Sequence, residues 1–258
     1  MNKIQSVRGT KDIFPAEMQK YNNIINKAKF ISHLYGFEEA AFPIIEKSDV
    51  FTRPLGESSD VVSKETYTFA DRGDERITLR PEGTAGIMRS VLSQGKLNEL
   101  PIKLFYSGQM FRYERPQKGR LRQFIQIGIE SIGSSNAIED VEVIQCGVSL
   151  LNKLGLLKSC VLNINSFGDS ESRNLYRDNL VKYFLRTESR LSEVSQGRLS
   201  LNPLRILDSK EPEDQDIIRQ APLLSSYLNN ISVDHFEKVL KYLIKSNIKF
   251  IHNEKLVR

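Results

Sequence analysis

Basic side chains crowd the segment ERPQKGRLR, where Arg115, Lys118, Arg120 and Arg122 fall within eight residues. Guanidinium and ammonium groups bind phosphate oxygens through charge-assisted hydrogen bonds, so the cluster suits the triphosphate of ATP or the phosphate of an acyl-adenylate. The charges alone fit a solvated basic loop equally well. Their meaning therefore depends on what the neighbouring residues place beside them.

The segments on either side of this loop, 103–113 and 123–132, alternate as β-strands do. Successive strand side chains point to opposite faces, so the second segment should have one apolar face and one polar face. The apolar face carries Ile125, Ile127 and Ile129; the other carries Phe124, Gln126, Gly128 and Glu130. The connection between the two segments is too long and too charged for a tight hairpin turn.

The polar face continues onto the first strand. Arg112 and Glu114 share a face by the period of two, and antiparallel pairing would place them on the same side as Gln126 and Glu130. Burying such charges without partners would cost roughly several kcal/mol for each charge, because each would lose its hydration. The face must therefore stay wet or hold a polar ligand.

Composition narrows the class of protein. The 258 residues are 40% hydrophobic and 27% charged, with no apolar run long enough for a membrane span and no apolar signal region near the N-terminus, so we expect a cytoplasmic protein. Two lone cysteines and three dispersed histidines predict neither a disulfide framework nor a metal site. The net charge of +5 does not distinguish a nucleic-acid partner from an ordinary surface.

Helical and extended segments alternate along the chain. Apolar spacing predicts a helix over 17–34 that Gly36 stops, and then a strand over 38–45 interrupted by Pro43. After about residue 169 the pattern becomes helical, with Ser170 and Ser232 as expected N-caps. We expect 170–248 to be a small helical insertion and 250–257 to return to the sheet.

Four motifs together resemble one family. FRYERPQKGRLRQFIQIGIE resembles motif 2 of the class II aminoacyl-tRNA synthetases in the form typical of histidyl-tRNA synthetases. LRPEGTAG resembles that family's amino-acid-binding motif, FEEAAFPIIEKSDVF resembles motif 1, and VRGTKDIFP near the N-terminus also matches. The resemblance covers essentially the whole chain.

The resemblance implies an α+β fold: the class II antiparallel sheet flanked by helices, with a small helical insertion and with the C-terminal part of the catalytic domain missing. It places the catalytic core at 1–169, with motif 1 at about 37–51, the amino-acid motif at 79–86 and motif 2 at about 104–133. The insertion would then occupy 170–248, and 249–258 would return to the core.

The resemblance also implies roles in binding ATP. Arg112 would bind the α-phosphate of ATP together with the carboxylate of histidine, as a catalytic residue. Phe124 would stack on adenine, Glu114 would contact the amino edge of the base, and Arg120 would reach the γ-phosphate. ATP would be a substrate accompanied by Mg²⁺, with no protein site dedicated to the metal.

For histidine, the family pattern implies that Glu82, Gly83, Thr84 and Gln126 surround the α-ammonium group. Glu130 would accept a hydrogen bond from the imidazole, for which a carboxylate is a suitable acceptor. The last residues, KLVR, resemble the start of a second histidine-specific motif, in which Arg258 would be a catalytic and histidine-binding arginine. The rest of that motif, motif 3 and the anticodon-binding domain do not occur in this sequence.

The expected activity is that of a histidine–tRNA ligase, with tRNA(His) as a partner and a homodimer formed through motif 1 around Pro43. We expect this chain alone to show little histidine-dependent ATP–pyrophosphate exchange. Two other interpretations stay open: the regulatory subunit of ATP phosphoribosyltransferase, which resembles the synthetases but does not catalyse their reaction, and a catalytically silent dimerising fragment.

Simpler structural explanations also stay open for single residues. Glu82 could serve only the N-terminus of the helix that TAGIMRSVLS predicts, since a carboxylate there is stabilised by the helix dipole. Gln126 and Glu130 could belong to the outer face of a half-exposed strand.

Overall fold

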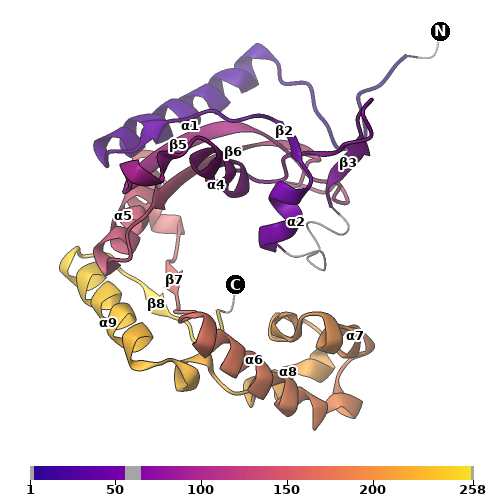
Figure 1. Ribbon diagram of the computed structural model, residues 1–258, viewed down its shortest axis with the longest axis vertical. Helices are drawn as coiled ribbons and strands as arrows, with labels where there is room; N and C mark the ends of the chain where they lie inside the picture. The colour runs from indigo at the N-terminus through magenta and orange to yellow at the C-terminus, as the bar shows by residue number, and fades with distance from the viewer. Residues whose placement is uncertain (1–2, 56–64, 257–258) are drawn as a thin grey trace. The chain divides into compact units, whose positions relative to one another are not determined.

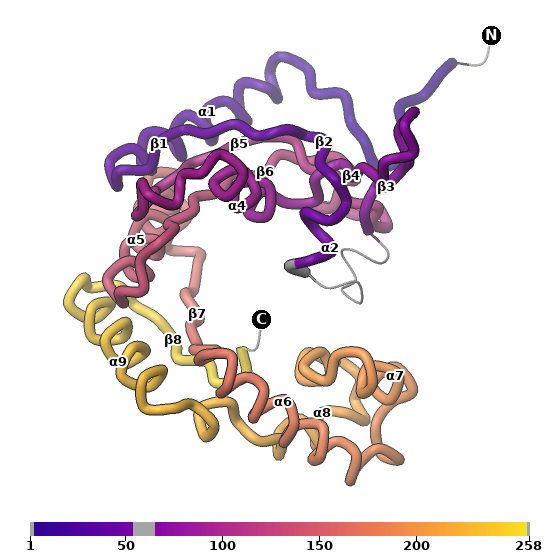
Figure 2. Tube along the Cα trace, viewed as in Figure 1, coloured from indigo at the N-terminus to yellow at the C-terminus, as the bar shows by residue number. Residues whose placement is uncertain are grey.

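A computed structural model describes residues 3–55 and 65–256. Within these residues the chain forms two compact units, Met1–Ser135 with Glu142–Leu156 and Asn136–Val141 with Leu157–Arg258. Figures 1 and 2 show the path of the chain through each unit. No helix in the described ranges combines the length and the apolar character needed to cross a membrane.

The first unit is built on the two long strands that the sequence predicts. Strand β5 (Ile102–Phe111) pairs antiparallel with β6 (Gln123–Ile132), in a register that sets Phe111 opposite Gln123. The short β1 (Glu38–Glu39) adds to the other edge of β5 and runs parallel to it. The sheet confirms the predicted strand pair and departs from a purely antiparallel arrangement only at this edge.

Helices cover both faces of this sheet. Helices α1 (Pro15–Leu34) and α5 (Ala137–Lys153) pack on the face that carries Phe105, Ile127 and Ile129, which confirms the predicted apolar face and the predicted first helix. Helix α4 (Thr84–Ser93) covers part of the opposite face, where Met110 is fully buried and Phe124 packs against the same cluster. The polar face is therefore only partly open to solvent.

The predicted strand over 38–45 is wrong in extent. Strand β1 ends at Glu39, and the chain becomes extended again at β2 (Ile45–Lys47) in a different sheet, beside β4 (Arg76–Leu79) and β3 (Tyr67–Ala70). Between them the carbonyls of Phe42 and Pro43 accept from the guanidinium of Arg80 rather than from a strand. Helix α2 (Asp49–Leu55) and the 3₁₀ turn η1 (Lys96–Glu99) complete this unit.

The second unit is mainly helical, as the sequence predicts. Its helices are α6 (Ser170–Leu185), α7 (Glu193–Leu201), α8 (Pro212–Arg219) and α9 (Asn230–Lys245), with 3₁₀ turns η2 (Leu157–Ser159), η3 (Glu188–Arg190), η4 (Pro203–Ile206) and η5 (Leu224–Tyr227). Strand β8 (Ile251–His252) pairs parallel with β7 (Asn163–Ile164). The chain thus enters and leaves this helical region at neighbouring strands. Strand β8 lies in this separate two-stranded sheet, and not in the sheet of β5 and β6 to which 250–257 was expected to return. The domain boundaries at 169 and 248 stay predictions.

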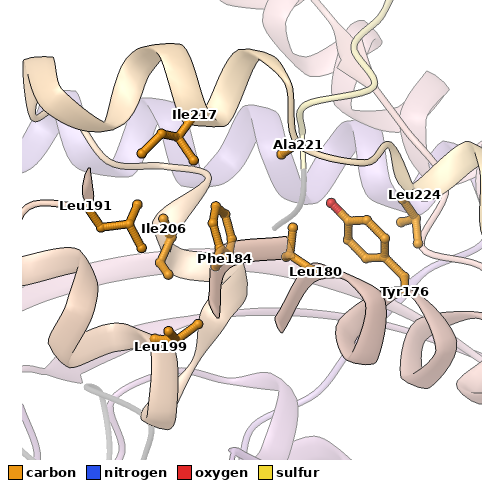
Figure 3. Packing of buried hydrophobic residues seen from close by; sticks show 9 residues of the cluster. All are labelled: Tyr176, Leu180, Phe184, Leu191, Leu199, Ile206, Ile217, Ala221 and Leu224. Carbon is orange, nitrogen blue, oxygen red and sulfur yellow. The ribbon is translucent and has the colours of Figure 1, made fainter. Parts of the chain in front are cut away.

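A compact apolar core holds the helical region together. Leu180 and Phe184 of α6 lie at its centre with no exposed surface, and Ile206 and Ile217 close over them (Figure 3). The residues that cap α6 and α9 lie one and three residues before the serines expected to cap them, Ser170 and Ser232. Asp169 caps α6 and Asn229 caps α9, because each side chain accepts from the amide three residues on, at Ser172 and at Ser232.

A buried carboxylate joins the helices of this unit. Asp214 of α8 has no exposed surface, and its Oδ2 accepts hydroxyl hydrogen bonds from Ser192, Ser195 and Ser209 at 2.9, 2.6 and 2.5 Å. Its Oδ1 accepts from the backbone N–H of Ser192 at 2.8 Å. Burial would raise the pKa of this carboxyl, but the four hydrogen bonds outweigh burial and hold the pKa below its ordinary value.

Candidate nucleotide and amino-acid site

Arg112 connects the two motifs that the sequence singles out. It follows β5 directly, and its Nε donates to the backbone carbonyl of Pro81, within the predicted amino-acid motif, at 2.9 Å. Its guanidinium carbon lies 5.3 Å from the centroid of the Phe124 ring, and its Nη1 lies 3.9 Å from Glu114 Oε1. One side chain thus contacts two residues predicted for ATP, Glu114 and Phe124, and the backbone of the motif predicted for histidine.

The basic loop folds back on itself beside Arg112. Gln117 and Arg120 form an isolated antiparallel bridge, and Arg120 Nη1 reaches Glu114 Oε2 at 3.1 Å. Together with Arg112 and Phe124 these side chains line a cavity of about 850 Å³. The four predicted nucleotide-binding residues, Arg112, Glu114, Arg120 and Phe124, are therefore brought to one place, although their roles toward ATP stay predictions.

Glu82 and Thr84 meet the second strand at the start of α4. The carboxylate of Glu82 accepts the backbone N–H groups of Thr84 at 2.6 Å and Ala85 at 2.9 Å, which confirms that it serves the helix N-terminus. The hydroxyl of Thr84 donates to Glu130 Oε1 at 2.8 Å. Three of the predicted histidine-binding residues, Glu82, Thr84 and Glu130, are thus linked side by side, with Gly83 between the first two.

Glu130 lies in an environment that resists negative charge. Burial raises the pKa of its carboxyl, the negative charge of Glu82 raises it further, and the hydrogen bonds from Thr84 and Tyr106 only partly offset these effects, so that the pKa lies above its ordinary value. Two neighbouring carboxylates that repel each other create a place where a cationic or donor-rich ligand is favoured.

Tyr106 is a site residue that the sequence analysis missed. Its side chain is 2% exposed and shares the polar face of β5, and burial together with the charge of Glu130 raises its pKa to about 12. The ring runs between two glycines: a Cβ at Gly83 or at Gly128 would come within 2.3 Å of it. The available signal was the parity of Tyr106 with Arg112 and the small residue opposite it at Gly128.

Gln126 contributes an acceptor that the protein does not satisfy. Its Oε1 is buried and has no hydrogen-bond partner among the residues that the structure describes. Buried acceptors are nearly always satisfied in native proteins, and an exception calls for a ligand or a bound water. The strand face that carries Gln126 and Glu130 therefore offers a ligand at least one unsatisfied acceptor.

A second hollow adjoins the start of α4. It measures about 970 Å³ and is lined by Glu82 and Thr84 together with Pro43, Glu46, Met88 and Arg89. Glu46 is 8% exposed and is neutralised by Arg89, whose Nη2 lies 2.5 Å from Glu46 Oε1. The remaining predicted residue, Arg258, lies outside the described residues, and no three His, Cys, Asp or Glu side chains within the described ranges could hold a metal ion.

Comparison with known families places this geometry in context. Residues 9–168, more than half of the chain, match a family model described as histidyl-tRNA synthetase. The chain is 46% identical over 256 residues to a histidine–tRNA ligase of Rickettsia felis, and 46% identical over 258 residues to one of Gluconobacter oxydans. The matches cover 99% and 100% of this chain, but only 62% of each relative.

Solved structures agree on the fold. The structure of apo histidyl-tRNA synthetase from Staphylococcus aureus is 36% identical and superposes with a TM-score of 0.77, covering 99% of this chain and 58% of that one. A Bacillus halodurans protein described as ATP phosphoribosyltransferase regulatory subunit/histidyl-tRNA synthetase superposes with a TM-score of 0.60 over 96% of this chain and 67% of that one. At 22% identity the second likeness shows the fold alone.

Proposed function

The chain belongs to the histidyl-tRNA synthetase family, and on that premise we propose that it provides the histidine and ATP site of a histidine–tRNA ligase. In the first step a carboxylate oxygen of histidine attacks the α-phosphorus of ATP. The bond from that phosphorus to the bridging oxygen of the β-phosphate breaks, and pyrophosphate leaves. A hydroxyl oxygen of the terminal ribose of tRNA(His) then attacks the carbonyl carbon of the histidyl-adenylate, the bond from that carbon to the phosphate oxygen breaks, and AMP leaves.

The observation that carries the proposal is the unsatisfied acceptor of Gln126. The α-ammonium group of an amino acid offers three donors and a positive charge, which suit Glu82, the unpaired Gln126 Oε1 and the hydroxyl oxygen of Thr84. The imidazole N–H of histidine would then donate to Glu130. A site of this kind discriminates strongly against ligands that leave its polar groups unpaired, often by about 10⁴-fold or more.

The nucleotide would occupy the 850 Å³ cavity beside Arg112. The Arg112 guanidinium lies between Pro81 O and the Phe124 ring, where it can neutralise the two anions that must meet, the α-phosphate and the histidine carboxylate. Phe124 would stack on adenine, Glu114 would contact the edge of the base, and Arg120 would reach the γ-phosphate.

Mg²⁺ would accompany the phosphates of ATP and neutralise part of their charge. It ordinarily takes one or two protein carboxylates together with phosphate oxygens, and Glu65, which lines the cavity, fits that requirement. We further propose tRNA(His) as the partner and a homodimer formed around Pro43.

Calorimetric titration tests the site directly. We expect the chain to bind histidine, ATP and a non-hydrolysable histidyl-adenylate analogue, the last most tightly. Arg112→Ala should weaken the analogue about a hundredfold, as removal of one preorganised donor costs about 3 kcal/mol. The matched control is Arg72→Ala, which removes an exposed arginine from the β3–β4 turn and should leave all three affinities unchanged.

Two outcomes would contradict the proposal. If Arg112→Ala bound the analogue with unchanged affinity, motif 2 would not be part of the binding site. Binding of histidine by a chain that takes neither ATP nor the adenylate analogue would favour a histidine-sensing regulatory protein instead.

A further inference from the structure

We propose that residues 7–10 form a clasp that holds the 114–122 loop in its nucleotide-binding shape, with Gly9 and Arg122 as positioning residues. The inference rests on the proposed ATP site and adds residues to it that need not touch the nucleotide. It also gives a role to the VRGT sequence, which precedes the first helix.

Arg122 is hydrogen-bonded to the segment 7–10 and does not extend freely into solvent. Its backbone N–H donates to the carbonyl of Gly9 at 2.7 Å, and its Nη1 donates to the carbonyl of Arg8 at 3.3 Å. Its Nε donates to the backbone carbonyl of Glu114 at 3.2 Å, and its guanidinium carbon lies 4.0 Å from the centroid of the Tyr113 ring. This arginine spans both ends of the loop and the segment 7–10.

The close approach requires a glycine at position 9. The φ of Gly9 is +88°, and a Cβ there would lie 2.8 Å from Arg122 Cγ and 3.0 Å from Pro116 Cγ. Thr10 fixes the turn from the other side, because its N–H and its hydroxyl both donate to the carbonyl of Val7, at 2.8 and 2.7 Å. The segment is thus shaped to receive Arg122.

The clasp is hydrogen-bonded to residues proposed to bind ATP. The carbonyl of Arg122 accepts the backbone N–H of Arg112 at 2.9 Å, so the backbone of Arg122 bonds to Gly9 and to Arg112 at once. Glu114, whose carbonyl holds Arg122, uses its carboxylate to hold Arg120. Lys11, two residues after Gly9, lines the same cavity as Arg112 and Arg120. Displacing Gly9 should therefore release the loop.

Tryptic cleavage after the exposed Lys118 and Arg120 reads the state of the loop without any ligand. In Gly9→Ala we expect both cleavages to be about tenfold faster, as a left-handed non-glycine residue costs about 1–2 kcal/mol and 1.4 kcal/mol corresponds to tenfold. ATP affinity should fall by a similar factor, with histidine affinity unchanged. The matched control is Gly95→Ala, which has φ +68° but open space around its Cβ and should alter neither readout.

Arg122→Lys provides a second variant that keeps the charge. We expect it to behave like Gly9→Ala, because an ammonium cannot make the Nε and Nη1 bonds at once. Unchanged cleavage in both variants would overturn the clasp, and so would an equal loss of histidine affinity, which would indicate general destabilisation. If the unaltered chain binds no ATP, the proposed function fails, while the cleavage rates still decide whether residues 7–10 hold the loop.

Discussion

Two carboxylates, one in each unit, differ in how completely the protein satisfies them. Asp214 is fully buried and receives four hydrogen bonds, which keep its pKa below the ordinary value. Glu130 is half-buried, receives hydrogen bonds from Thr84 and Tyr106, and faces Glu82; its pKa lies above the ordinary value. The first is satisfied by its own chain, and the second is left with acceptor capacity.

If the proposed function is right, this difference separates a structural carboxylate, Asp214, from a ligand-binding one, Glu130. Hydrogen bonds that favour the charged form convert a desolvation cost into a stabilising interaction, as at Asp214. A binding site cannot be satisfied in the same way without losing its affinity for the ligand. Neutralising Asp214 should therefore lower the stability of the fold, whereas neutralising Glu130 should lower the affinity for histidine without lowering stability.

Asp214→Asn should have the largest effect. The variant removes the charged acceptor of three hydroxyls and one amide in a fully buried place, and breaking such a network costs about 3 kcal/mol. Urea titration followed by hydrogen exchange in α7 and α8 would measure the loss. Asp216→Asn, which removes an exposed carboxylate paired with Arg219, is the control and should change stability by less than about 0.5 kcal/mol. Equal effects of the two variants would break the comparison.

Glu130→Gln should act on binding instead. Loss of a charged acceptor for the imidazole should weaken histidine binding by about 2 kcal/mol, or roughly thirtyfold. The stability of β5 and β6 should stay constant or rise, because the variant removes a partly desolvated charge. Calorimetry and hydrogen exchange would test the two statements, with Glu75→Gln at an exposed ion pair as the control. A stability loss as large as that of Asp214→Asn would show that Glu130 is structural.

The pH dependence of the two variants should also differ. Because the folded pKa of Asp214 is lowered, its stabilisation is complete above the ordinary value of about 4 and is lost as pH falls through the folded pKa. For Glu130 the folded pKa is raised, so the cost of its charge appears as pH rises from about 4.3 through the folded pKa. Hydrogen exchange between pH 3 and 8 should thus show the Asp214→Asn deficit shrinking only in acid, and the Glu130→Gln advantage growing toward neutral pH. Parallel pH profiles for the two variants would be incompatible with opposite pKa shifts.

Periodicity predicted the strand pair and its faces because residues 123–132 alternate without interruption. The motifs also predicted that Arg112, Glu114, Arg120 and Phe124 lie together, and all four line one cavity. They come from one strand pair and its connecting loop, which keeps residues close in space that are close in the sequence. The strand over 38–45 could not be delimited, because its end depends on Arg80, which comes from a distant segment and takes two of the carbonyls.

Contacts between distant segments account for the rest of what sequence reasoning missed. The sequence around Asp214 does not predict its hydrogen bonds from Ser192 and Ser195, because the two serines precede it by about twenty residues. Arg122 looked like one of four phosphate-binding charges, yet its partners at Gly9 and Arg8 lie more than a hundred residues away. Tyr106 was not singled out from the sequence, because its place between Gly83 and Gly128 depends on the fold.

The smallest expected effect concerns two tyrosines, one in each unit, that are buried to the same extent. Tyr106 in the first unit and Tyr176 in the second are 2% and 3% exposed, and burial raises the pKa of each to about 12, so both phenols stay protonated near neutral pH. Only Tyr106 donates toward Glu130. Tyr106→Phe should therefore weaken histidine binding by about 1 kcal/mol, the usual value of one hydrogen bond, while Tyr176→Phe leaves the affinity unchanged. If calorimetry found the same affinity in both variants, Tyr106 would be a packing residue like Tyr176, and orientation of Glu130 would rest on Thr84 alone.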